Sequence, residues 1–280
     1  PGKLLETVAR AIDIATSGRP GPVVISIPED VFEAMVPAFD SATGARAGLA
    51  VDPDTLCEVA ARLVAAERPL LIAGTLVNTE RGRAALARVV RGFGVPLAVE
   101  FRQQDLFPND DPLYAAQLGF KIPPAQIEVL AGADLLLAIG TDLGDVPTQG
   151  FTFPRSPVPA QPMIHVYPDA EVAARVYQPQ LRCIADSVAF LEALAALVPA
   201  QPPSRPAWIE SLQTYLRRIR VFDPAPAADG VSFGHVVAAL DRQMQDDAVL
   251  VVDSGNFNTW TQRYFTEQNG GLTLLDLPGE

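Results

Sequence analysis

One short stretch near the carboxyl end combines residue types suited to binding an anion. Residues 249–252 form an apolar run of strand type, Asp253-Ser254-Gly255-Asn256 forms a turn, and residues 257–265 have a helical pattern. A strand–turn–helix junction exposes backbone amides at the positive end of the helix dipole, which favours a phosphate group. Gly255 would let the backbone approach the ligand closely. An ordinary helix start explains the same residues equally well.

A second group of candidates follows two apolar runs in the middle of the chain. Gly74-Thr75 comes directly after residues 70–73, and Gly140-Thr141 comes after residues 134–139. Ligands of doubly wound sheets bind beyond the carboxyl ends of the strands, so a nucleotide-like site at these four residues is one hypothesis. A dinucleotide fingerprint needs three glycines after the first strand, and only Gly74 is present. A tight turn would use the same glycine.

The remaining chemistry-bearing residues predict no further site. His165 and His235 are the only histidines, and neither has neighbours that complete a metal set. We predict that each is a hydrogen-bonded structural residue. Cys57 and Cys183 are far apart and form neither a disulfide framework nor a zinc pattern. Serine-hydrolase, zinc-protease and P-loop motifs are missing. We therefore predict no catalytic residue and no metal ligand within this chain.

The elements that position these candidates alternate between helical and strand patterns. Over residues 53–199, apolar runs without polar alternation are separated by amphipathic helices. This order predicts an α/β fold with a doubly wound parallel sheet, a Rossmann-like central domain. Pro- and Ala-rich stretches at 36–51 and 200–230 are expected linkers, the second around a short helical piece at 208–219.

Partial α/β domains are expected on both sides of the central domain. Residues 1–39 contain a helical pattern over 4–15 and a strand pattern over 23–27. Residues 230–280 begin a third domain. The chain starts at Pro1 without an initiator methionine, so we expect an internal piece of a longer protein.

Composition excludes several classes of partner. The 280 residues include 33 acidic and 21 basic side chains, which gives a formal net charge of −12. Nucleic acids and anionic membrane surfaces both attract basic proteins, so neither is an expected partner. No apolar run approaches the roughly 18 residues of a membrane span. Two cysteines suit a reducing compartment, and we expect a cytoplasmic protein.

Three stretches, in this order, resemble thiamine-diphosphate-dependent enzymes, and the acetolactate synthase branch is the most similar. Residues 18–31 resemble the end of the pyrimidine-binding domain, and residues 251–256 with Trp260 resemble the opening of the diphosphate-binding domain. The stretches between them that resemble the central domain are Ala73-Gly74, Phe107-Pro108, Asp111-Pro112-Leu113, residues 133–140 and Ile164-His165-Val166.

The resemblance implies where thiamine diphosphate would be held. The diphosphate-contacting turn corresponds to Ser254, Gly255, Asn256 and Phe257. The family often has a Gln-His pair where this chain has Asn256-Phe257, so a polar side-chain contact from Phe257 is in doubt. The activating glutamate would precede Pro1, and the Mg²⁺-binding segment would follow Glu280. We therefore expect this piece alone to be inactive.

The resemblance also implies a reaction class. Family members decarboxylate a 2-oxo acid, with the cofactor as electron sink. The leading hypothesis is an acetolactate synthase-like transferase that decarboxylates the 2-oxo acid and carries out carboligation. Such an enzyme would be a homodimer or a homotetramer. A 2-oxo acid decarboxylase or carbon–carbon lyase, a non-catalytic nucleotide-binding relative and an NAD-dependent enzyme are the alternatives.

Biosynthetic acetolactate synthases also bind FAD on the central domain, and this chain departs from them at three positions. Leu76 replaces the second glycine of the first turn, Asp142 replaces an arginine and Tyr167 replaces an acidic residue. A carboxylate at position 142 would repel a pyrophosphate. We therefore predict that FAD is not bound.

Overall fold

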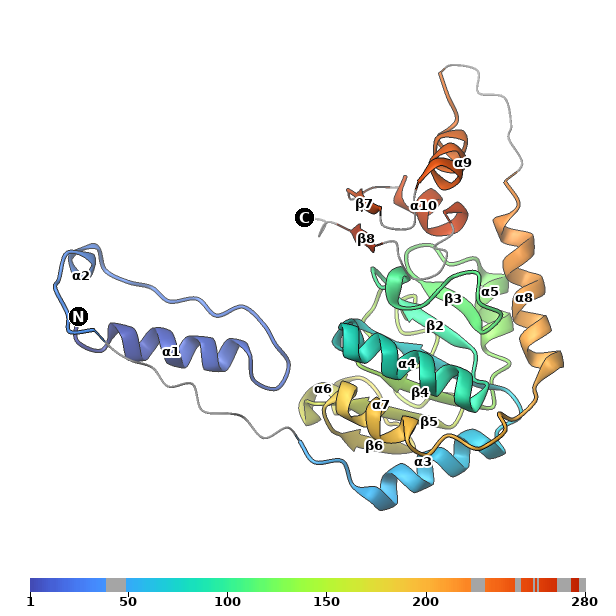
Figure 1. Ribbon diagram of the computed structural model, residues 1–280, viewed down its shortest axis with the longest axis horizontal. Coiled ribbons are helices and arrows are strands. Elements are labelled where there is room, and N and C mark those ends of the chain that lie inside the picture. Colours follow the sequence, from blue (N-terminus) through green and yellow to red (C-terminus); the bar gives the residue numbers. More distant parts are fainter. Residues whose placement is uncertain are drawn as a thin grey trace. The chain divides into compact units, whose positions relative to one another are not determined.

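The computed structural model describes residues 1–38, 49–222, 230–244, 248–253, 255, 257–265 and 273–276 (Figure 1). The chain divides into two units, residues 1–49 and 50–280. Each unit is described by itself below.

The first unit has two helices and no buried residue in either of them. Helix α1 spans Leu4–Ala15, as predicted, and α2 spans Glu29–Phe32. The strand predicted over residues 23–27 is wrong, because this segment pairs with no other described strand. Val24 is 91% exposed. A β-rich run becomes a strand only where a neighbour accepts and donates its backbone hydrogen bonds.

The second unit is built on a six-stranded sheet in which every neighbouring pair is parallel. The strand order is β3-β2-β1-β4-β5-β6, the doubly wound order of dinucleotide-binding folds. The predicted α/β fold class is therefore confirmed. The strands are β1 (Pro69–Ala73), β2 (Leu97–Glu100), β3 (Tyr114–Leu118), β4 (Leu135–Ile139), β5 (Met163–Tyr167) and β6 (Leu181–Ile184).

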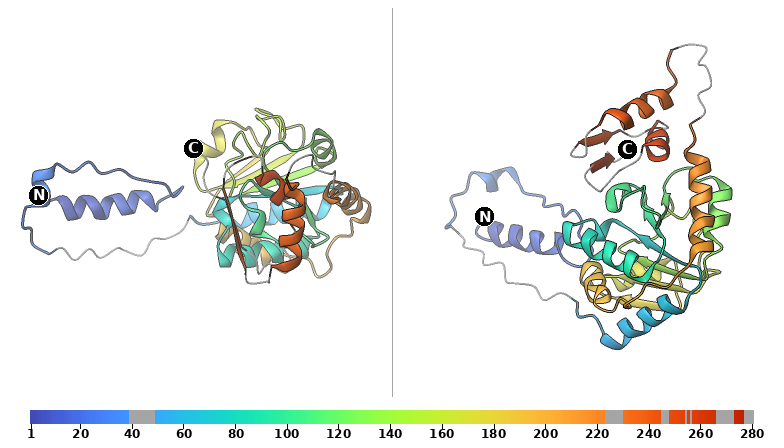
Figure 2. Two further views of the ribbon diagram at one scale, coloured as in Figure 1. Left: turned by 90° about the horizontal axis from the view of Figure 1, so that it is seen from above. Right: turned by 45° about the vertical axis from the view of Figure 1, so that its right-hand side comes forward.

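Helices cover both faces of this sheet, and alternate strand residues enter two separate cores (Figures 1 and 2). One core packs Leu71, Leu97 and Leu137 against α3 (Pro53–Ala65), α4 (Glu80–Phe93) and α7 (Ser187–Ala195). The other packs Leu70 and Leu136 against α5 (Pro124–Leu130) and α8 (Pro206–Arg220). Three short elements complete this region: η1 (Thr75–Val77), η2 (Gln104–Leu106) and α6 (Ala170–Arg175).

Side-chain caps fix where the helices begin. The carboxylates of Asp52 and Asp186 accept backbone N–H bonds from Thr55 and Ala189, both at 2.8 Å. Thr79 caps α4 in the same way through its hydroxyl oxygen. Such caps satisfy helix N–H groups that have no partner within the helix.

Helix α8 packs against the sheet, in contrast to the linker expected over residues 200–230. The indole N–H of Trp208 donates to the carbonyl of Pro69 at 2.9 Å, and Leu212 is buried in the second core. The amide of Gln213 donates to the carbonyls of Pro112 and Tyr114, both at 2.8 Å. The helix therefore covers β3, the strand at one end of the sheet.

Arg205, immediately before α8, joins this helix to two others. Its guanidinium donates to the carbonyls of Ala66 at 2.9 Å and Gly94 at 3.2 Å, and also to those of Leu63 and Phe93. These carbonyls lie at the carboxyl ends of α3 and α4, where the last carbonyls of a helix lack partners and a cation is favourable. Arg205 is only 6% exposed.

The last part of the second unit has a much smaller core. It contains α9 (Phe233–Gln243), β7 (Val249–Val252), α10 (Asn258–Tyr264) and β8 (Thr273–Asp276), and β7 pairs with β8 in parallel. Its buried apolar residues, among those described, are Val237, Val252 and Phe265. His235 lies on α9 as predicted, with its ring edge-to-face on Phe222 at 5.2 Å.

Candidate functional site

The candidate glycines lie at the topological switch point of the sheet, where the order of successive strands reverses between β1 and β4. Strands β1 and β4 are neighbours, and Gly74 and Gly140 directly follow them. The N–H of Gly74 donates to the carbonyl of Ile139 at 3.1 Å, and the N–H of Leu76 donates to that of Gly140 at 3.0 Å. The structure thus brings the predicted residues Gly74, Thr75, Gly140 and Thr141 to one edge of the sheet.

Close packing at this edge explains the first glycine. A Cβ atom on Gly74 would lie 2.3 Å from a carboxylate oxygen of Glu100 and 2.5 Å from the Cβ of Thr141. Any side chain at position 74 would therefore displace its neighbours. Thr141 is buried, and its hydroxyl accepts the N–H of Leu143 at 3.0 Å. The edge is occupied by the protein's own backbone and side chains.

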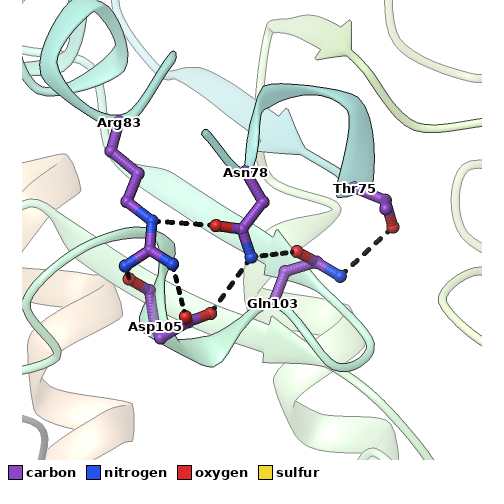
Figure 3. A network of polar contacts seen from close by, with 5 residues as sticks. All are labelled: Thr75, Asn78, Arg83, Gln103 and Asp105. Atoms are coloured by element: carbon purple, nitrogen blue, oxygen red, sulfur yellow. Dashed lines mark hydrogen bonds and ion pairs between the residues drawn. The ribbon is translucent and has the colours of Figure 1, made fainter. Parts of the chain in front are cut away.

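Beside these glycines lies a polar network of five residues, Thr75, Asn78, Arg83, Gln103 and Asp105 (Figure 3), of which Gln103 and Asp105 are buried. It connects the segment after β1 with the segment after β2. The amide of Asn78 donates to Gln103 at 2.7 Å and to Asp105 at 3.3 Å. The amide of Gln103 in turn donates to the hydroxyl of Thr75 at 3.2 Å. The network fixes how these two segments lie against each other.

An ion pair anchors the network. Arg83 donates to a carboxylate oxygen of Asp105 at 2.6 Å, to the backbone carbonyl of Asp105 at 3.2 Å and to the amide oxygen of Asn78 at 2.8 Å. The side chain of Asp105 is 3% exposed, whereas that of Arg83 is 32% exposed. A carboxylate this deeply buried depends on its partners for stability.

Acidic groups dominate this edge of the sheet. Glu100 and Asp105 are both buried there, and Asp142 follows β4. Arg83, the nearby cation of the network, is already paired with Asp105. A pyrophosphate placed here would meet carboxylates rather than unpaired basic groups.

His165 is a structural residue, as predicted. It lies in β5, is 1% exposed, and its Nε2 is hydrogen-bonded to the carbonyl of Thr141 at 2.9 Å. Burial lowers the pKa of its imidazole below the ordinary value, because a charged ring would lose its hydration. The hydrogen bond between the neutral imidazole of His165 and the carbonyl of Thr141 therefore connects β5 with the segment after β4.

Sequence reasoning missed four of the five network residues. Asn78 and Arg83 lie in one segment and Gln103 and Asp105 in another, and the hydrogen-bonded pairs between the segments are 22 to 27 residues apart in the sequence. Only the position of Gln103 and Asp105 after the expected strand 96–99 could have indicated the carboxyl edge. The contacts between the two segments form because β1 and β2 are neighbours in the sheet, and the sequence alone does not show which strands are neighbours.

The anion-binding turn is described only in part. Ser254 and Asn256 lie outside the described residues. Gly255 has φ +150°, a backbone conformation that favours glycine, and a Cβ there would lie 2.7 Å from the ring of Phe257. Phe257 is 37% exposed and carries no polar atom for an anion. The described part of the turn therefore has a glycine conformation at Gly255 and no polar side chain at Phe257.

Two features are absent from the described residues. Within them, no group of three or more His, Cys, Asp or Glu side chains could hold a metal ion. None of their helices is long and apolar enough to cross a membrane.

Comparison with known proteins identifies the central region. Residues 56–194 match the family model described as "Thiamine pyrophosphate enzyme, central domain". This central region belongs to that family. The matched range covers all six strands of the parallel sheet and ends within α7, before Arg205 and α8.

Relatives of this family match nearly the whole chain. The acetolactate synthase isozyme 1 large subunit of Escherichia coli is 28% identical over 270 residues, which are 94% of this chain and 46% of that protein. A probable 2-ketoarginine decarboxylase of Pseudomonas aeruginosa is 32% identical over 264 residues, 92% of this chain and 45% of that protein. The chain thus spans less than half the length of these relatives.

Proposed function

We propose that the protein containing this chain is a thiamine-diphosphate-dependent enzyme that decarboxylates a 2-oxo acid and joins the product to a second carbonyl compound. The observation that carries this proposal is the match to an acetolactate synthase large subunit over 94% of the chain. Residues 1–39, 53–199 and 230–280 would be the end of the pyrimidine domain, the central domain and the start of the diphosphate domain. A cytoplasmic homodimer or homotetramer is part of the proposal.

The turn after β7 would hold the diphosphate of the cofactor. Gly255 supplies the glycine conformation of the turn, and backbone amides around Ser254, Asn256 and Phe257 would donate to phosphate oxygens. When bound, thiamine diphosphate supplies the electron sink for loss of CO₂. Mg²⁺ would be held by residues outside this chain.

The test is turnover by the complete protein. Purified protein is supplied with pyruvate, thiamine diphosphate and Mg²⁺, and CO₂, acetolactate and acetaldehyde are measured. Acetolactate formed in proportion to CO₂ supports carboligation. Absence of CO₂ release from pyruvate and from a panel of other 2-oxo acids would contradict the proposal and favour a non-catalytic relative.

Simple decarboxylation is the second candidate, and one observation favours it. The probable 2-ketoarginine decarboxylase is more similar to this chain, at 32% identity, than the acetolactate synthase isozyme at 28%. In this case the same assay yields CO₂ and the aldehyde in equal amounts, without a ligated product.

We also propose that the central domain takes no FAD. Support comes from the buried carboxylates of Glu100 and Asp105 at the strand ends and from the close packing around Gly74. The absorption spectrum of the purified complete protein tests this directly. A stoichiometric flavin band near 450 nm, released by denaturation as FAD, would overturn it.

A further inference from the structure

A second candidate site shares no lining residue with Gly74, Thr75, Gly140 and Thr141 or with the diphosphate turn at residues 254–257. It is a pocket of about 270 Å³, bounded by the segment after β3, helix α5, the end of α8 and helix α10. Ligand pockets for small molecules begin at about 300 Å³, so this one suits a compact ligand.

The charges on its wall are all of one sign. Lys121, Arg220 and Arg263 line the pocket, and none of its described lining residues is acidic. This is unusual in a chain whose net charge is −12. Arg220 donates to the backbone carbonyl of Asn109 at 2.9 Å and lies 5.5 Å from the ring of Tyr114. Among the described residues, no carboxylate forms an ion pair with Arg220 or Arg263.

Aromatic rings and amides form the rest of the wall. Phe120, Trp260 and Tyr264 line the pocket, and the rings of Trp260 and Tyr264 lie 5.6 Å apart at 36°. The amide nitrogen of Gln117 is buried at the wall and has no hydrogen-bond partner among the described residues. Flat rings suit a planar ligand, and amide donors suit its oxygen atoms.

One wall is held in place before any ligand arrives. Gln149 donates from its amide nitrogen to the carbonyl of Gly119 at 2.8 Å and accepts the N–H of Ile122 at 3.2 Å. Lys121, between these two bonds, has φ +53°, which non-glycine residues rarely adopt. A fixed wall lowers the entropy cost of binding.

We propose that this pocket binds a small aryl carboxylate. The carboxylate would lie between Arg220 and Arg263, where charge-assisted hydrogen bonds are strong, and the ring would pack on Trp260 and Phe120. The proposal does not require the function proposed above, because none of the residues Ser254, Gly255, Asn256 and Phe257 lines the pocket, although α10 follows that turn directly.

The probe is benzoate, measured by isothermal titration calorimetry on the complete protein without thiamine diphosphate. We expect saturable binding of benzoate and no binding of benzamide, which has the same shape without the charge. Arg263→Gln should weaken benzoate binding by tenfold or more. Arg218→Gln is the matched control, because Arg218 lies on the same helix as Arg220 but does not line the pocket.

Two outcomes would overturn the proposal. One is equal affinity of benzoate for the Arg263→Gln and unaltered proteins. The other is binding that requires thiamine diphosphate, which would place benzoate at the cofactor site. Trp260→Leu provides a second variant if Arg263→Gln does not fold, and it should also weaken binding. Absence of benzoate binding would not change the result expected in the turnover assay, so the two experiments test the two proposals separately.

Discussion

The central sheet and the flanking segments contain equally apolar strand sequences, yet they have different environments. Strand β4 has every residue buried, because it lies between β1 and β5 and under helices on both faces. Strand β7 has a similar sequence, but Val249 and Val251 are each 56% exposed. The apolar run at 23–27 forms no strand. An apolar run is stabilised by the neighbours that cover it, and among the described residues this cover is complete around β4 but incomplete around β7 and residues 23–27.

Truncation of a buried side chain in β4 should therefore have the largest effect. Leu137→Ala removes a fully buried side chain and should lower the free energy of unfolding by about 3 to 5 kcal/mol. Urea denaturation followed by circular dichroism measures it. Val251→Ala in β7 is the matched control and should cost less than about 1 kcal/mol. Equal costs at both positions would contradict the comparison.

Arg205 should have the next largest effect, because it alone connects four helix-terminal carbonyls. Arg205→Met keeps most of the side-chain volume but removes all of these hydrogen bonds, so we expect a loss of about 2 to 4 kcal/mol. Thermal and urea unfolding report the change. Arg218→Met, at an exposed position on α8, should leave the unfolding midpoint unchanged.

The polar network should respond less strongly. Asp105→Asn keeps the shape of the side chain but removes the ion pair with Arg83, at a cost of about 1 to 3 kcal/mol. The lower end of the range reflects the partial exposure of Arg83. Asp111→Asn breaks a more exposed pair with Arg91 and should cost less than about 1 kcal/mol. Urea unfolding of both variants measures the difference.

His165 should give the smallest effect, visible as a pH dependence. Its pKa is lowered by burial in the folded state, so the unfolded chain binds the proton more tightly. Stability should therefore fall as the pH drops below about 6.5, by no more than about 1.4 kcal/mol per pH unit. His165→Gln should flatten this part of the stability profile, measured by urea unfolding at a series of pH values.

The sequence predicts the fold of the central domain well because its helices and strands are defined locally. Asp52 and Asp186 stand directly before helical patterns and cap α3 and α7, and the predicted apolar runs form β1 and β4. Strand β3 was not predicted, since Tyr114–Leu118 contains no β-branched residue and forms only by pairing with β2.

Features that depend on distant partners were predicted poorly. The helical piece at 208–219 is predicted and present as part of α8, but its Pro-rich surroundings favour a linker, so its packing against the sheet is not predicted. The polar network was not predicted because Arg83 and Asp105 meet only after β1 and β2 have paired. The position of Gly74 and Gly140 at one edge of the sheet can be predicted from the strand ends alone. The burial of Glu100 and Asp105 at the same edge is visible only in the structure.

The position of α8 over β3 has a consequence for how the central domain can be isolated. A protein cut at residue 199 would keep all six strands but would lose Gln213, whose amide bonds to carbonyls of Pro112 and Tyr114 beside the outermost strand. An uncovered outer strand offers its backbone to a second molecule, and edge-to-edge association follows. We expect the 50–199 piece to aggregate and the 50–222 piece to remain monodisperse. We therefore expect helix α8, although it lies outside residues 56–194 of the family match, to prevent edge-to-edge association at β3.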